Sequence, residues 1–427
     1  MKKTVQELLS FIATCTSPYH TVATSQSLLE ANGFIEVKLE EGWNIASGGK
    51  YYTKVYDSTL IAFKVGNKET SGLKIAAAHT DFPCFRIKPE PGILTEGYGT
   101  LNVEGYGGMI VSTWLDRPLS LAGKVVLKGK NPFKPKVHLV DFKRPLLSMP
   151  NLAIHMNREV NDGYKWNKQQ DVLPLATKLE AKSKEKDFFT KFLAKELECK
   201  EGDILSYELT TYPVETGCTF GFDNEFISAP RLDNITSVKA CLDGIIASKA
   251  QQGVQIAAIF DNEEVGSNTK QGAGSHILLQ VIERIYTLLG KDKETMLRDI
   301  ASGFMLSVDV AHALHPNHVD KCDPTNKPVM NGGLVLKQAA SQAYAGDAEA
   351  VAIIAGLCKE NDIPFQNFVN RSDLKGGSTL GSIASALVPI RTMDVGVPML
   401  AMHSARETMG AEDEQALKDL LVAFFAK

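Results

Sequence analysis

The feature that most constrains this fold is a regular alternation of short apolar runs with longer amphipathic segments in the second half of the chain. Each amphipathic segment precedes an apolar run: ITSVKACLDGIIASKAQ before VQIAAIFD, HILLQVIERIYTLLG before FMLSVDV, DAEAVAIIAGLCKEND before FQNFVN, and SIASALVPIRTMDVG before PMLAMHS. Near the start, SGLKIAAAHTD is another apolar run that ends in polar residues. This alternation predicts an α/β fold with a mostly parallel sheet flanked by helices.

The stretch between these two parts has a different texture. From about Gly92 to Asn224, glycine, valine, threonine and tyrosine recur with turn signals every few residues, which is typical of antiparallel strands. We therefore expect residues 1–90 and 226–427 to form one discontinuous α/β domain. Residues 91–225 are expected to form an inserted β-rich domain.

Composition argues against several classes of protein. The 427 residues include 46 basic and 50 acidic ones, so the net charge of -4 gives no reason to expect nucleic acid or a membrane as a partner. No run approaches the ~18 apolar residues of a membrane span. Gln6 and Glu7 interrupt the apolar core that a signal peptide would need. Seven scattered cysteines without C-x-x-C spacing suit a reducing compartment, so we expect a cytoplasmic protein.

Histidine and acidic residues stand at the ends of the expected strands. They are His79 and Asp81 after 73–78, Glu263 and Glu264 after 254–260, Asp309 after 304–308, and His403 after 399–402, with Asp233 just before a helix. In open α/β sheets, ligand sites form outside the carboxyl ends of the strands. These side chains are therefore expected to converge in one crevice.

The residue types in this set indicate a metal centre. Imidazole and carboxylate together suit zinc, with cobalt or manganese as alternatives, whereas thiolates are absent from the set. A single catalytic ion usually takes three ligands from the protein, so the set is large enough for two divalent ions that share a bridging carboxylate. Asp233 is the candidate for the bridge.

The adjacent glutamates Glu263 and Glu264 fit the same interpretation. Two neighbouring carboxylates repel each other unless a cation lies beside them. Because neighbouring side chains diverge, we expect one glutamate to bind metal and the other to act as a general base on a water. Asp81 lies two residues after His79, so in extended backbone it can accept the second ring N–H of that histidine. The alternative for Asp81 is a helix cap or turn former.

The motifs HTD, RLDN, DNEEVGS, SVDVAHALHPN and MHSARE occur in this order, with TSPYHTV near the start. With the long insert after the first ligand strand, the chain resembles the aspartyl aminopeptidase and vacuolar aminopeptidase I family of dizinc exopeptidases. The resemblance extends over nearly the whole chain. It implies a metalloaminopeptidase that hydrolyses N-terminal residues from peptides and prefers acidic (Asp/Glu) N-termini.

The resemblance also implies a role for each site residue. The expected ligands of two zinc ions are His79, Asp233, Glu264, Asp309 and His403. Asp233 would bridge the ions, and Glu263 would be the general base. His155 would enter the site of a neighbouring subunit, and Lys337 would face the acidic side chain of the substrate. The insert would be a dimerisation domain, and dimers would assemble into a dodecamer.

Several residues keep an alternative interpretation. A histidine among apolar residues, such as His155, is often part of a core, and Lys337 could be an ordinary exposed lysine at a strand end. The stretch AHALHPNHVDKC offers three histidines and Cys322, but their spacing fits a closed zinc site poorly.

The chain departs from the family pattern at two places. Asn262 stands where relatives often have histidine, and Leu374-Lys375-Gly376 stands where they often have Ser-Pro-Cys. Two other functions stay open: a related dizinc amidohydrolase (a deacylase, carboxypeptidase or dipeptidase), and a non-catalytic assembly scaffold.

Overall fold

The structure is a computed structural model that describes residues 2–67, 72–181, 183–249 and 252–427. It divides into two compact units. The first unit comprises Met1–Asp81, Gly217–Met402 and Glu407–Lys427, and the second unit comprises Phe82–Thr216 and His403–Arg406. The sequence placed the first boundary at residue 91, which falls inside strand β5 (Cys84–Thr95). The boundary was misplaced because prolines at 89 and 91 look like a break between domains. In the structure they lie where the pairing of β5 shifts register, between Ile87 and Gly92.

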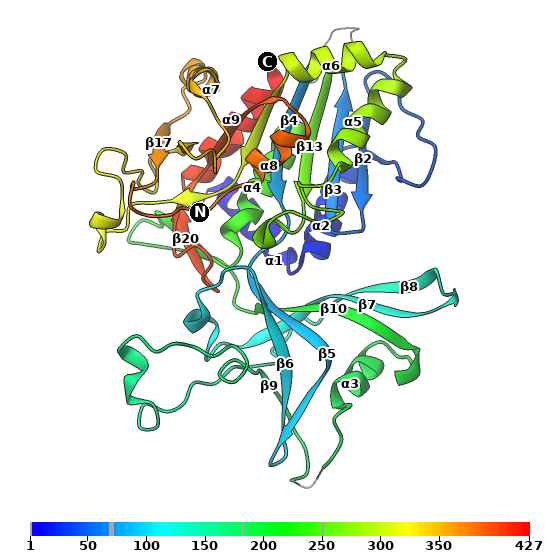
Figure 1. The fold of residues 1–427 in the computed structure, drawn as a ribbon, viewed down its shortest axis with the longest axis vertical. Coiled ribbons are helices and arrows are strands. Elements are labelled where there is room, and N and C mark those ends of the chain that lie inside the picture. The colour runs from blue at the N-terminus through cyan, green and yellow to red at the C-terminus, as the bar shows by residue number, and fades with distance from the viewer. Residues whose placement is uncertain (1, 68–71, 182, 250–251) are drawn as a thin grey trace. The chain divides into compact units, whose positions relative to one another are not determined.

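A nine-stranded sheet is the centre of the first unit within the described residues (Figure 1). Its spatial order is β1 (Ile35–Glu36), β2 (Lys50–Val55), β3 (Thr59–Val65), β13 (Val254–Phe260), β4 (Leu73–His79), β14 (Phe304–Val308), β18 (Arg391–Gly396), β16 (Leu334–Gln338) and β17 (Phe365–Val369). The central strands β13, β4, β14 and β18 run parallel to one another. On either side, β3 and β16 run antiparallel to this central block. The predicted α/β class is confirmed.

Helices cover both faces of this sheet (Figure 1). They are α1 (Lys3–Thr14), α2 (Pro18–Ala31), α4 (Leu232–Ala247), α5 (Ile277–Leu288), α6 (Lys293–Ser302), α7 (Ala348–Glu360), α8 (Leu380–Leu387) and α9 (Asp413–Ala426). Helices α5, α6 and α8 contribute to one apolar cluster with the strands. Helix α4 contacts β4 and β13 and packs along α9. Among the described residues, none of the helices combines the length and the hydropathy needed to cross a bilayer.

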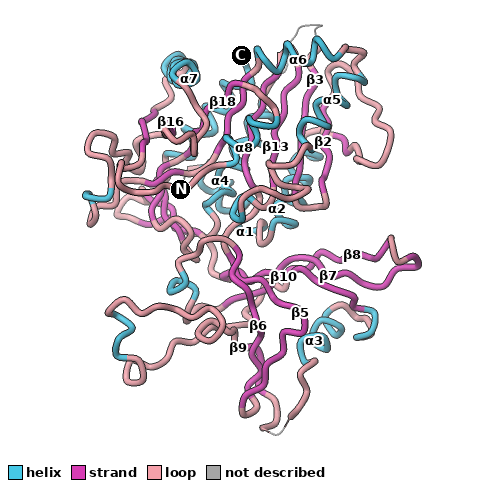
Figure 2. The backbone as a smooth tube through the Cα atoms, in the orientation of Figure 1, coloured by secondary structure: helices cyan, strands magenta, loops and turns pink. Residues whose placement is uncertain are grey.

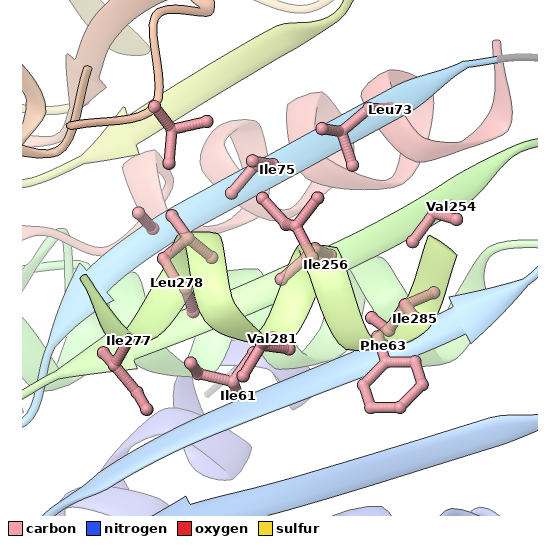
Figure 3. Close-up of a cluster of buried hydrophobic side chains, with 14 of the residues drawn as sticks. Ile61, Phe63, Leu73, Ile75, Val254, Ile256, Ile277, Leu278, Val281 and Ile285 are labelled. Carbon is pink, nitrogen blue, oxygen red and sulfur yellow. The ribbon is translucent and has the colours of Figure 1, made fainter. Parts of the chain in front are cut away.

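The packing of α5 explains how the strands keep their register. Its apolar residues Ile277, Val281 and Ile285 are spaced one turn apart and face Ile61 and Ile256 of the sheet (Figure 3). Each fully buried side chain of this size contributes about 1.5–3 kcal/mol. A slip of one residue would turn a whole strand face away from the helix, so the register is strongly specified.

This register sets the positions of the strand ends. Phe260 at the end of β13 lies opposite His79 at the end of β4, and Ser307 of β14 lies opposite Ala77. The residues that follow β13, β4 and β14 therefore lie near one another at the same edge of the sheet.

Smaller elements of the first unit include a second sheet and a short turn. A five-stranded sheet is formed by β11 (Cys218–Phe220), β12 (Phe226–Ala229), β20 (Glu407–Gly410), β19 (Pro398–Leu400) and β15 (Ala311–His312). A short 3-10 turn, Glu263–Val265, follows β13. These elements hold the segments around residues 233, 264 and 309 to the same part of the unit.

The second unit is built mainly of strands and loops (Figure 2). Its sheet has the order β8 (Lys134–Asp141), β7 (Leu119–Asn131), β10 (Ile204–Pro213), β5, β6 (Tyr98–Tyr106) and β9 (Leu175–Lys178). One helix, α3 (Phe188–Glu196), buries Phe189 and Leu193. The antiparallel pairing agrees with the texture of the sequence in this stretch.

Candidate metal centre

The first residue of the cluster is His79, the last residue of β4, which is 1% exposed. Its Nδ1 lies 3.0 Å from the backbone oxygen of Asp81 and 3.3 Å from the Asp81 carboxylate. Its Nε2 lies 3.5 Å from Asp233, 3.6 Å from Asp309 and 4.0 Å from Glu263. One ring nitrogen is therefore held by Asp81, and the other faces three carboxylates.

Asp233 is brought to His79 by the start of α4. Arg231, two residues before Asp233, has a left-handed backbone with φ 61°. The N–H of Asp233 donates to the carboxylate of Glu407 at 3.1 Å, and the side-chain amide of Asn234 donates to the oxygen of Val308 at 2.9 Å. The first bond ties the helix start to β20, which begins at Glu407, and the second ties it to the end of β14.

The two glutamates follow Asn262, whose backbone is left-handed with φ 63°. This conformation is enriched in asparagine relative to other non-glycine residues. The N–H groups of Glu263 and Glu264 donate to the two oxygens of Asp81 at 3.1 and 3.0 Å. Thr269 also donates to the Asn262 side chain at 2.8 Å. Asp81 therefore fixes both His79 and the turn that bears the glutamates.

Asp309 follows β14 and has a buried lysine beside it. The Nζ of Lys337, on β16, lies 3.4 Å from Oδ2 of Asp309 and donates to the oxygen of Val310 at 2.8 Å. Lys337 is 2% exposed, so the alternative of an ordinary exposed lysine is wrong. Burial opposes its charge, but the carboxylates of Asp309 and Asp394 raise the pKa of Lys337 above the ordinary value.

The ligand atoms form adjoining groups that could hold metal. His79, Asp233 and Asp309 offer atoms within 4.8 Å of one another, and so do His79, Glu263 and Glu264. Asp233 also has an oxygen within 4.8 Å of Glu264. Asp233 thus lies near ligand atoms of both groups.

The charges of the cluster favour divalent cations. Burial raises the pKa of Glu263 to about 8; His79 opposes this shift, whereas Asp309, Asp81 and Asp233 add to it. Burial would lower the pKa of His79, but its hydrogen bonds to Asp233, Asp309 and Asp81 raise it well above the usual range. Several carboxylates therefore face the imidazole of His79. A divalent cation would relieve their repulsion, and imidazole with carboxylate is a donor set that zinc accepts.

Two expected site residues belong to the second unit. His403 begins the segment His403–Arg406, and its Nδ1 lies 2.7 Å from the backbone oxygen of Gly108. The role of His403 as a metal ligand stays a prediction. His155 lies exposed in an irregular stretch of the second unit, so it is not a core histidine.

The remaining sequence candidates are the histidine-rich segment after Asp309 and Lys375. In the segment that contains His312, His315, His318 and Cys322, the rings of His315 and His318 are 4.9 Å apart. Across the described ranges, the groups able to hold a metal include none from that segment. Lys375, in the loop that departs from the family pattern, is exposed.

Sequence reasoning missed two residues that shape the cluster. Glu407, which anchors the backbone of Asp233, lies in the MHSARE motif, so its position in the motif was an available signal. Asp394 lies directly across from Lys337 in the β18–β16 pairing. A single acidic residue inside a short strand gave no comparable signal.

Comparison with known proteins gives consistent results. Residues 11–425 match the family model described as "Aminopeptidase I zinc metalloprotease (M18)". The "Probable M18 family aminopeptidase 2" of Clostridium novyi is 46% identical over 96% of each chain. The protein of the same name from Clostridium acetobutylicum is 44% identical over 98% of each chain.

Solved structures show the same fold. Ape4, in a cryo-EM structure of its complex with Nbr1, superposes with a TM-score of 0.94 at 32% identity, covering 99% of this chain and 85% of that one. A chain of the S. cerevisiae mApe1 dodecamer superposes with a TM-score of 0.84 at 26% identity, covering 99% of this chain and 96% of that one.

Proposed function

Because the chain belongs to the M18 family of zinc aminopeptidases, we propose that its cluster holds two zinc ions and removes acidic residues from peptide N-termini. The observation that supports the two-ion proposal is the position of Asp233. Its carboxylate lies 3.5 Å from His79 and also has an oxygen within 4.8 Å of Glu264. A shared carboxylate of this kind is typical of sites with two metal ions.

The proposed ligands divide into two sets. His79 and Asp309 would hold one zinc, Glu264 and His403 would hold the other, and Asp233 would bind both. Bound zinc would supply Lewis acidity, polarising the scissile carbonyl and making a water acidic enough to lose a proton near neutral pH.

Glu263 is the proposed general base. Its carboxylate lies beside the cluster, 4.0 Å from the Nε2 of His79, on a turn whose two N–H groups are held by Asp81. In this role Glu263 takes a proton from the attacking water and passes it to the leaving amine. His155, from a neighbouring subunit, would donate a hydrogen bond to the oxyanion that forms at the carbonyl.

Lys337 supports the preference for acidic substrates. It is a buried lysine that contacts the cluster directly, and its positive charge would favour a carboxylate at the first side chain of the peptide. Lys375 is exposed in the loop that departs from the family pattern, so we assign it no part in this preference.

A homo-oligomer is the proposed assembly, as in the mApe1 dodecamer, with the second unit as the dimerisation domain. Donation of His155 between subunits requires such an assembly. None of the seven cysteines, all of which lie in the described ranges, forms a disulfide, which suits the cytoplasm that we propose as the compartment.

The experiment that tests this function separates the two glutamates. Glu263→Gln is expected to keep its zinc and to lose ~10²-fold or more in kcat on an aspartyl substrate, because the base is gone while the ligands remain. Glu264→Gln is expected to lose zinc as well as activity. Zinc content by elemental analysis and steady-state kinetics give both readouts.

Two results would contradict the proposal. Near-wild-type turnover by Glu263→Gln would remove that residue from the role of base. A higher kcat/KM for leucyl than for aspartyl and glutamyl substrates would reject the acidic preference while leaving the aminopeptidase itself intact.

A further inference from the structure

Lys337 occupies an unusual position for a residue that only recognises a substrate. It is 2% exposed, and its strand β16 pairs antiparallel with β18 so that Lys337 lies directly opposite Asp394. Directly opposed residues of two strands project from the same face of the sheet. From there the Lys337 side chain reaches the end of β14, the strand beyond β18 in the sheet order.

The ammonium group of Lys337 is already engaged. One contact goes to the backbone oxygen of Val310 at 2.8 Å, and another goes to Oδ2 of Asp309 at 3.4 Å. The ring of Tyr344 lies 4.7 Å from Nζ on a further side. An ammonium group has three N–H donors, so most of its capacity is directed at the protein itself.

The two oxygens of Asp309 have different neighbours. Oδ1 lies 3.6 Å from the Nε2 of His79, whereas Oδ2 lies 3.4 Å from Lys337. Lys337 therefore engages one oxygen of this carboxylate, and the other oxygen faces the Nε2 of His79. Outer partners that orient a metal-binding carboxylate typically contribute 10–100-fold to metal affinity.

A lysine beside a metal could instead repel the ion. Asp394 reduces this repulsion because it adds a negative charge across from Lys337. Its carboxylate is fully buried and accepts the backbone N–H of Ala345. Burial raises the pKa of Asp394 only to about 6, so the carboxylate is ionised at neutral pH. The Lys337–Asp394 pair then adds little net charge, and the contact that orients Asp309 remains.

We infer that Lys337 is a positioning residue for the metal centre, which orients Asp309 as a ligand through one oxygen. This inference rests on the proposed zinc site and is separate from any role of Lys337 in recognising acidic substrates. A lysine that served the substrate alone would leave zinc retention unchanged when it is replaced.

The test measures zinc retention without any substrate. Wild-type protein and Lys337→Met are loaded with zinc alone, and the free zinc at half-release is determined by titration with a chromophoric chelator. Lys337→Met is expected to hold zinc at least ~10-fold more weakly. Lys337→Gln retains an amide donor, so its loss should be smaller and in the same direction.

Lys64→Met is the matched control. Lys64 is 3% exposed and donates to the oxygens of Ile246 and Ser248, at the opposite edge of the same sheet. Its replacement should leave zinc retention within twofold of wild type. Thermal unfolding of the zinc-free proteins shows which variants are folded. If Lys337→Met does not fold, the zinc retention of Lys337→Gln tests the positioning role.

The outcomes separate this inference from the proposed function. If the wild type binds no zinc, the proposed site itself is wrong. If the wild type binds zinc and the folded Lys337 variants bind it equally well or more tightly, the positioning role is wrong while the site stands. A change in aspartyl-to-leucyl selectivity with unchanged zinc retention would assign Lys337 to the substrate only.

Discussion

Charged side chains are buried near both ends of the strands in the nine-stranded sheet, but their charges are offset in different ways. At the edge where β3 ends, Lys64 donates to the backbone oxygens of Ile246 and Ser248. At the opposite end, where β4 and β14 finish, the carboxylates of Asp233 and Asp309 face the imidazole of His79. The first arrangement is complete within the protein. The second concentrates negative charge and is favoured by added cations.

This difference teaches which buried charges indicate function. A buried charge with backbone partners is a structural solution, because its hydrogen bonds replace those it had with water. Like charges that converge from separate strands raise one another's free energy unless a ligand offsets it. Chemistry is therefore expected at the strand ends where the carboxylates converge.

The largest expected effect comes from replacing the shared carboxylate at the site edge. Asp233→Asn should reduce aminopeptidase kcat/KM by about 10³-fold, since the Lewis acidity of a metal centre is worth several kcal/mol. The matched control is Asp413→Asn, a buried aspartate that accepts the N–H groups of Asn331 and Gly333. Comparable activity losses in the two variants would show that Asp233 has no special role.

A smaller effect is expected from Asp81→Ala. This change removes the acceptor for the N–H groups of Glu263 and Glu264 and the carboxylate beside His79. Activity should fall by about 10–100-fold, as is typical when an outer partner of metal ligands is lost. Asp299→Ala, at a buried aspartate bonded to Tyr286, should leave specific activity of the folded enzyme unchanged. Full activity in Asp81→Ala would mean that Asp81 serves only as a turn former.

The smallest effect concerns the opposite edge. Burial lowers the pKa of Lys64 to about 8, so between pH 8 and 10 the unfolded chain binds more protons at this residue than the folded chain. The wild type should therefore gain unfolding free energy over Lys64→Met as pH rises through that range. Denaturant titrations at several pH values measure the difference. A difference that is constant with pH would mean that Lys64 keeps its ordinary pKa when folded.

Much of the fold could be predicted from the sequence because its strands are buried on both faces. The apolar runs that end in His79, Asp309 and the glutamate pair are strands that end at one edge, as their periodicity indicated. The convergence of His79 and Asp309 also follows from this topology, since the ends of parallel strands meet at one edge, whereas Asp233 comes from the start of α4.

Other features depend on contacts that a sequence does not display. The antiparallel direction of β16 places Lys337 across from Asp394, and nothing in the sequence reveals that direction. Asn262 looked like a departure from the family pattern, yet its left-handed backbone and its bond from Thr269 give it a place in the turn. The burial of Lys337 likewise depends on tertiary packing rather than on its local neighbours.

The most direct test of the proposal that these converging carboxylates bind metal is the zinc content of the intact wild-type protein. After loading with zinc and removal of the excess, elemental analysis should find two ions per chain, and a strong chelator should abolish hydrolysis until zinc is restored. Protein that holds no zinc after loading, or that keeps its activity in the chelator, would contradict the account.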